Sequence, residues 1–108
     1  MKENYNKFVD EKVANLITIL NKIKAIIEKN TTSVAWSRFE SKEEVISKLD
    51  NHIERIQSHK FNKMWDLVIL FAPTGSLQEI SISNGWEDVY LVLASEFDTA
   101  IKELKHIL

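Results

Sequence analysis

The chain has 108 residues, 44% of them apolar and 28% charged, with 16 acidic against 14 basic residues and a formal net charge of −2. These values are typical of one folded domain spanning residues 1–108 and exclude a disordered chain. The absence of cysteine excludes disulfides, a thiol nucleophile and a cysteine-ligated zinc site, and the slight acidity argues against nucleic acid as a partner.

The apolar residues are never gathered into a targeting or membrane-spanning segment. The N-terminal residues lead into an amphipathic stretch, and no run approaches the roughly 18 apolar residues that a membrane span requires. We therefore predict a cytoplasmic protein with no membrane partner. Because the chain contains only two glycines and one proline, we also expect long helices with few sharp turns.

The first predicted element is a long amphipathic helix over about residues 5–29. Its apolar residues recur at steps of three and four, and the polar cluster at 30–33 ends the pattern. The regularly spaced apolar residues are Val9, Val13, Leu16, Ile17, Leu20, Ile23 and Ile27. Ile19 and Ile26 lie off this stripe and leave an additional apolar face, which a second copy of the chain could cover.

Residues 34–39 alternate between two faces, a pattern that predicts a short strand. Val34, Trp36 and Arg38 share one of these faces. Trp36 lies in a polar neighbourhood and is therefore a candidate for contact with a partner, although tryptophan more often fills a protein core.

The second helix is predicted over about residues 42–58. Ser41 and Glu44 match a capping box, in which each side chain accepts a hydrogen bond from a backbone N–H that the helix leaves unpaired. The apolar stripe that follows consists of Val45, Ile46, Leu49, Ile53 and Ile56. His52 lies beside this stripe, and we interpret it as a residue at the edge of the core, because the next histidine, His59, is about two helical turns away and too distant to share a metal ion.

Two structures fit residues 61–71. Phe61, Met64, Trp65 and Val68 match one face of a helix, which would place Trp65 in the core. The five residues at 67–71 are all apolar, however, as in a buried strand. We favour the helix, and the strand remains an alternative.

The next segment contains the only proline and both glycines of the chain. The sequence Pro-Thr-Gly-Ser at 73–76 predicts a tight turn with Gly75 at positive φ, and Asn84-Gly85 predicts a second turn. Residues 77–83 alternate between polar and apolar and predict a strand, which would pair with the earlier alternating segment.

The last helix is predicted to start within residues 84–87 and to run to within a few residues of the C-terminus. Asn84 is a favourable N-cap, and Glu87 and Asp88 place negative charge at the positive end of the helix dipole. The expected buried face consists of Trp86, Val89, Tyr90, Leu93, Phe97, Ile101, Leu104 and Leu108.

Together these elements predict a mainly α-helical domain with a small β element, an α+β fold of about four helices. The β element would be a short hairpin of residues 34–39 and 77–83, or a small antiparallel sheet if residues 67–71 are extended as well.

Candidate binding residues gather between residues 73 and 86, because loops held by a rigid scaffold commonly carry such residues. No nucleophile, metal or cofactor motif accompanies them, so the sequence predicts no catalytic residue, no cofactor and no metal ligand. The polar and aromatic candidates for contact with a partner are Thr74, Ser76, Gln78, Glu79, Asn84 and Trp86, together with Trp36.

The order of these features resembles that of small uncharacterised bacterial domains. The likeness is carried by the sequence Trp-Ser-Arg-Phe at 36–39, after the first helix, and by the Gly-Ser-Leu-Gln-Glu turn at 75–79. No activity is established for such domains. Proteins of this size and character often resemble immunity proteins encoded beside bacterial toxins, and the resemblance therefore implies a binding role of that kind.

The sequence leaves three functions open. The first is a non-catalytic binding protein, an immunity- or antitoxin-like inhibitor that occludes a protein partner such as a toxin and turns Glu79, Glu87 and Asp88 toward its basic surface. The second is a small enzyme or ligand-binding domain with a site near Glu79, Asn84 and the second helix. The third is a homodimeric structural or interaction protein.

Overall fold

The computed structural model describes residues 2–29, 32–35, 37–73 and 75–107, with side chains described from residue 7 onward. Within these residues the chain forms five α-helices and no strand. The helices are α1 (Lys2–Lys29), α2 (Lys42–Gln57), α3 (Met64–Leu70), α4 (Ser76–Ser83) and α5 (Glu87–Ile107).

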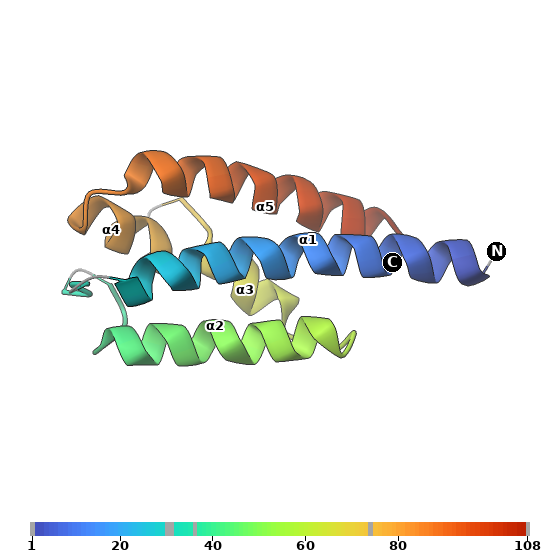
Figure 1. Ribbon diagram of the computed structural model, residues 1–108, viewed down its shortest axis with the longest axis horizontal. Helices are drawn as coiled ribbons and strands as arrows, with labels where there is room; N and C mark the ends of the chain where they lie inside the picture. The colour runs from blue at the N-terminus through green and yellow to red at the C-terminus, as the bar shows by residue number, and fades with distance from the viewer. Residues whose placement is uncertain (1, 30–31, 36, 74, 108) are drawn as a thin grey trace.

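The three long helices α1, α2 and α5 form the body of the molecule, and α1 lies between the other two (Figure 1). Both α2 and α5 run antiparallel to α1, so the two chain ends lie toward the same end of the bundle. The short helices α3 and α4 belong to the connection between α2 and α5, and α4 packs on α5. The molecule is elongated, with extents of 47 × 23 × 22 Å.

The apolar stripe of α1 forms the centre of the core, as its periodicity predicts. Leu16, Leu20 and Ile23 have no exposed surface, because α2 covers α1 from one side and α5 from the other. The same arrangement accounts for the residues off the stripe, since Ile19 is buried and Ile26 is half-buried. The additional apolar face of α1 is therefore occupied within one chain.

Both ends of α2 are closed by hydrogen bonds. At its start the Glu44 N–H donates to Ser41 Oγ at 3.2 Å, and the Glu44 carboxylate in turn accepts from the Glu40 N–H at 3.3 Å. At its end the Lys60 N–H donates to the Arg55 carbonyl at 2.8 Å and the His59 N–H to the Ile56 carbonyl at 3.0 Å, the two bonds of a Schellman cap. His59 occupies the left-handed position of this cap, with φ of 57°.

An aromatic cluster fixes the end of α3 on α5. The ring of Phe71, the residue after α3, stacks on Phe97 with centroids 3.8 Å apart, and the Tyr90 hydroxyl donates to the Phe71 carbonyl at 3.3 Å. Trp86 meets Tyr90 edge to face at 6.1 Å. Burial raises the pKa of Tyr90 to about 12, with a smaller contribution from the negative charge of Asp98.

The predicted α+β fold is wrong, because all three proposed strand segments adopt other structures. Residues 67–71 lie in α3 and its C-cap, which settles the ambiguity there in favour of the helix. Residues 77–83 lie in α4, where Leu77, Ile80 and Ser81 form the buried face. The Ser81 hydroxyl donates to the Gln78 carbonyl at 2.7 Å, and this bond allows a polar side chain to be buried. The apolar residues that suggested the alternation of a strand therefore belong to a helix.

The described part of residues 34–39 is a turn instead of a strand. The Ser37 N–H donates to the Val34 carbonyl at 3.0 Å, and the Phe39 N–H donates to Ser37 Oγ at 3.1 Å. These local bonds occupy groups that a strand partner would need, because serine side chains offer the backbone an alternative to a ladder.

The two glycines have different roles from one another. Gly85 adopts φ of 79° and follows Asn84, the C-cap of α4, in a second Schellman cap in which the Trp86 N–H donates to the Ser81 carbonyl at 2.9 Å. Gly75 has φ of −75°, so the predicted positive φ is wrong there. Its requirement is space, because a Cβ would lie 2.8 Å from the Ala72 carbonyl oxygen and 2.9 Å from that of Ile69.

Candidate functional site

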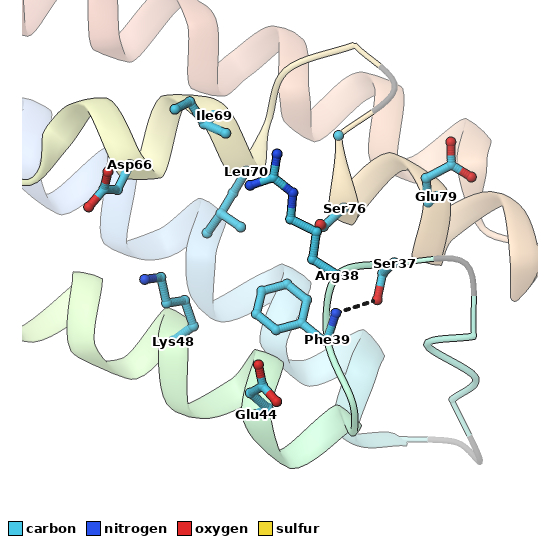
Figure 2. Close-up of a pocket in the computed structure, with 11 residues that line it drawn as sticks. Ser37, Arg38, Phe39, Glu44, Lys48, Asp66, Ile69, Leu70, Ser76 and Glu79 are labelled. Atoms are coloured by element: carbon cyan, nitrogen blue, oxygen red, sulfur yellow. Dashed lines mark hydrogen bonds between the residues drawn. The ribbon is translucent and has the colours of Figure 1, made fainter.

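A groove of about 470 Å³ lies between α2, α3, the start of α4 and the turn at residues 37–39 (Figure 2). Its apolar lining comes from Phe39, Ile69 and Leu70. The close approach of Gly75 to the last carbonyl groups of α3 brings the first turn of α4 to the edge of this groove. The groove thus combines segments that are up to about forty residues apart in the sequence.

Five charged side chains border the groove. Arg38 and Lys48 are basic, and Glu44, Asp66 and Glu79 are acidic. Neither Arg38 nor Lys48 forms an ion pair with any residue that the structure describes. Figure 2 shows the Arg38 side chain extending between the end of α3 and the start of α4. Asp66 lies in the first turn of α3, and Glu44 lies on α2. The groove can therefore accept a ligand with both an apolar part and a charged part.

The structure brings only two of the predicted site residues into this groove, Ser76 and Glu79. Gln78 is half-buried on α4 outside the groove lining. Trp36 and Thr74 lie outside the described residues, so their candidate roles stay predictions.

Asn84 and Trp86 serve the fold instead of forming part of the groove. The Asn84 side chain accepts from the Ser33 N–H at 2.9 Å and donates to the Ser33 carbonyl at 2.8 Å, which ties the turn after α1 to the end of α4. It also donates to the Ile80 carbonyl at 2.7 Å. Trp86 is half-buried against Tyr90. Of the two residues expected near one site, Glu79 lines the groove and Asn84 does not.

Two groups of exposed apolar residues were missed by the sequence analysis. Trp65 was expected in the core, but it is 67% exposed, and Ile69 one turn later is also exposed. The second group lies on α4 and α5 and consists of Ile82, Val89, Leu91 and Val92, which are between 49% and 59% exposed. Val89 was expected in the core as well, and it lies instead at the edge of the α5 face that packs inward.

A charge asymmetry accompanies the second group. Between Lys63 and Lys102 the chain contains six acidic residues and no lysine or arginine. Asp88 and Glu96 lie one turn before and one turn after Val92 on α5, so the exposed apolar residues share their surface with negative charge. A count of charged residues along the sequence would have revealed that this stretch is acidic and has no basic residue.

His52 is the one described side chain with a buried polar atom that lacks any hydrogen-bond partner, its Nε2. The side chain is 2% exposed, on the face of α2 that packs inward, instead of at the edge of the core as expected. Burial lowers the pKa of His52, and the nearby positive charges of Lys48 and Arg55 lower it further.

The described residues contain no group of three histidine, aspartate or glutamate side chains placed to hold a metal ion. No helix in the described ranges is both long enough and apolar enough to cross a membrane. Comparison of the chain with protein-family models, with curated proteins and with solved structures returned no significant match.

Proposed function

We propose that this protein is a non-catalytic inhibitor of the immunity or antitoxin kind, which occludes a basic protein partner with its α4–α5 surface. This surface is defined by Ile82, Val89, Leu91 and Val92 together with the acidic residues Glu87, Asp88 and Glu96. The observation that carries the proposal is the presence of four exposed large apolar side chains within eleven residues of a stretch that contains no basic residue.

The apolar residues supply a reason for association. A monomeric protein rarely exposes several large aliphatic side chains in one region, and such regions commonly mark contact with another protein. On α5, Val92 is 59% exposed and points away from the buried face that includes Tyr90, Leu93 and Phe97. Because Val92 does not belong to the core, binding would remove its apolar surface from water without disturbing the core.

The charges select the partner. The acidic residues around Val92 favour a partner with lysine or arginine side chains at the rim of its own apolar patch, because complementary charge accelerates encounter and disfavours acidic competitors. A nuclease-type toxin whose substrate site is basic has this chemistry. The resemblance of the chain to immunity-like domains supports the same choice of partner.

A binding measurement with the product of the adjacent gene tests this proposal. We expect the purified pair to associate, and Val92→Lys to weaken the affinity at least about tenfold, because it removes a central apolar contact and places a positive charge among the acidic residues. Phe8→Ser is the matched control, since Phe8 is 54% exposed but lies on α1, outside the α4–α5 surface. Isothermal titration calorimetry at two salt concentrations provides the affinities.

Three results would contradict the proposal: no binding by the adjacent gene product, equal affinities of the Val92→Lys variant and the unaltered chain, or equal losses in the Val92→Lys and Phe8→Ser variants. Affinity that does not decline as salt increases would remove the electrostatic part of the argument. The third function suggested by the sequence, a homodimer, predicts a mass near twice the chain mass of 12.6 kDa in light scattering.

A further inference from the structure

We propose that the α4 end of the groove is a binding site for a small carboxylate that carries an apolar tail. This inference goes beyond the proposed inhibitor function and does not depend on it, because the groove and the α4–α5 surface consist of different residues. It starts from hydrogen-bond donors at the groove that no described group of the chain satisfies.

Ser76 provides the first of these donors. It is 8% exposed, lines the groove, and its hydroxyl has no hydrogen-bond partner in the part of the chain that the structure describes. Figure 2 shows the hydroxyl oxygen on the side of α4 where the Arg38 side chain extends. Because Ser76 lines the groove, its hydroxyl is available to donate a hydrogen bond to a ligand there.

The start of α4 adds backbone donors at the same place. Gly75 is the N-cap and forms no side-chain cap, and its carbonyl accepts a hydrogen bond from the Glu79 N–H at 3.1 Å. The N–H groups of Ser76 and Leu77 have no partner among the described residues. Amide groups of this kind, at the positive end of a helix dipole, favour an anion.

Arg38 supplies the positive charge. The hydrogen bonds of Ser37 and Phe39 hold the turn on both sides of it, so the turn presents Arg38 to the groove (Figure 2). No described carboxylate pairs with its guanidinium. A guanidinium forms two parallel hydrogen bonds with one carboxylate, a geometry that suits this ligand class.

The remaining lining residues define what the anion is attached to and how much charge it carries. Ile69 and Leu70 offer an apolar wall beside the donors, which fits an aliphatic tail. Glu44 and Glu79 repel additional negative charge. We therefore expect a monoanionic carboxylate to bind more tightly than inorganic phosphate, which carries more charge at pH 7.5.

Titration of the ¹⁵N-labelled chain with hexanoate, followed by NMR, tests the site. We expect saturable shifts of the amide signals of Ser76 and Leu77 and of the Arg38 guanidinium signals, at constant ionic strength. Acetate and inorganic phosphate are the comparison ligands, and both should bind more weakly, acetate because it lacks the tail and phosphate because of its charge. Chloride at equal ionic strength is the blank.

Four variants make the test specific. Arg38→Gln should weaken hexanoate about tenfold, as expected for loss of a charge-assisted hydrogen bond, and Ser76→Ala should weaken it several-fold. Glu79→Gln should instead tighten it, because it removes a repelling charge. Lys22→Gln is the matched control, since Lys22 is exposed on α1 away from the groove and should leave the affinity unchanged.

The proposal is overturned if the shifts do not saturate, if acetate or phosphate binds as tightly as hexanoate, or if Arg38→Gln and Lys22→Gln weaken binding equally. Amide dispersion and thermal unfolding confirm that each variant is folded. Ser76→Ala should not lower the thermal midpoint, because the hydroxyl that it removes has no partner among the described residues. A Val92→Lys variant should bind hexanoate normally, so failure here is distinguishable from failure of the inhibitor proposal.

Discussion

At the scale of single residues, His52 shows how burial alone creates a pH-dependent group. The groups around its ring are Lys48 and Arg55 on its own helix and Asp66 on α3, and only Asp66 favours the charged form. The two cations and the loss of hydration outweigh this carboxylate, so the folded pKa lies below the usual value of about 6.5. The folded protein therefore resists protonation of His52, while the unfolded chain does not.

The consequence is a loss of stability in mild acid. Well above pH 6.5 the imidazole is neutral in both states and contributes no pH dependence. As the pH decreases below this value, the unfolded chain binds the proton first, so the free energy of unfolding falls until the folded pKa is passed. We expect the thermal midpoint to decrease between pH 7.5 and 5.5, and His52→Leu to flatten most of this decrease. His106→Gln, at an exposed position, should retain it, and equal curves for the His52→Leu and His106→Gln variants would contradict the assignment.

Asn84 shows what residue type alone does and does not indicate. Asparagine followed by glycine correctly predicts a turn, and Gly85 does adopt a positive φ. The residue type does not show which helix it serves, and the expected N-cap of the last helix proved to be the C-cap of α4. The hydrogen bonds to Ser33 link segments 51 residues apart, and no local pattern contains such a pairing.

At the scale of elements, the long helices were predictable and the short ones were not. Helices α1, α2 and α5 extend over several turns, so many apolar residues lie on one face of each helix. The prediction of these three helices was confirmed. Helix α4 has eight residues, and over that length Leu77, Ile80 and Ile82 fit a strand as well as a helix. The choice is made by α5, against which α4 packs, and this contact is invisible in the local sequence.

The C-terminal caps of α2 and α4 yield a prediction of stability. Both use the same pair of hydrogen bonds, but α4 places Gly85 at the left-handed position and α2 places His59 there. A side chain with a Cβ is disfavoured in this conformation. We therefore expect His59→Gly to raise the free energy of unfolding by about 0.5–1 kcal/mol, measured by urea denaturation.

One contact of His59 opposes this gain. Its Nε2 lies 2.9 Å from an oxygen of the Asp10 carboxylate, but the pair is exposed, and exposed pairs contribute little to stability. The complementary variant Gly85→Ala should lower the free energy of unfolding by about 1 kcal/mol. A decrease for His59→Gly would show that the contacts of its ring with Asp10 and Phe61 outweigh the backbone strain.

At the scale of the whole molecule, the groove could be predicted only in part. Ser76 and Glu79 were chosen because they lie near a turn, and they do line the groove. Arg38 and Lys48 were not chosen, because an isolated basic residue in a sequence indicates an ordinary solvated side chain. Their relation to Ser76 arises only when the turn after α1, the middle of α2 and the start of α4 meet in space.

The arrangement of the helices also predicts how stability is distributed. Helix α1 is packed between α2 and α5, whereas α3 has seven residues and α4 eight, too short to persist without tertiary contacts. We therefore expect native-state hydrogen exchange to be slowest in the central turns of α1, around Leu16, Leu20 and Ile23. The amides of α3 and α4 should exchange faster, through partial opening that leaves the three long helices in place. Because both short helices line the groove and α1 does not, saturating hexanoate should slow exchange in α3 and α4 and leave α1 unchanged. Equal exchange rates in α1 and α4 without ligand would instead mean that the bundle opens as one cooperative unit.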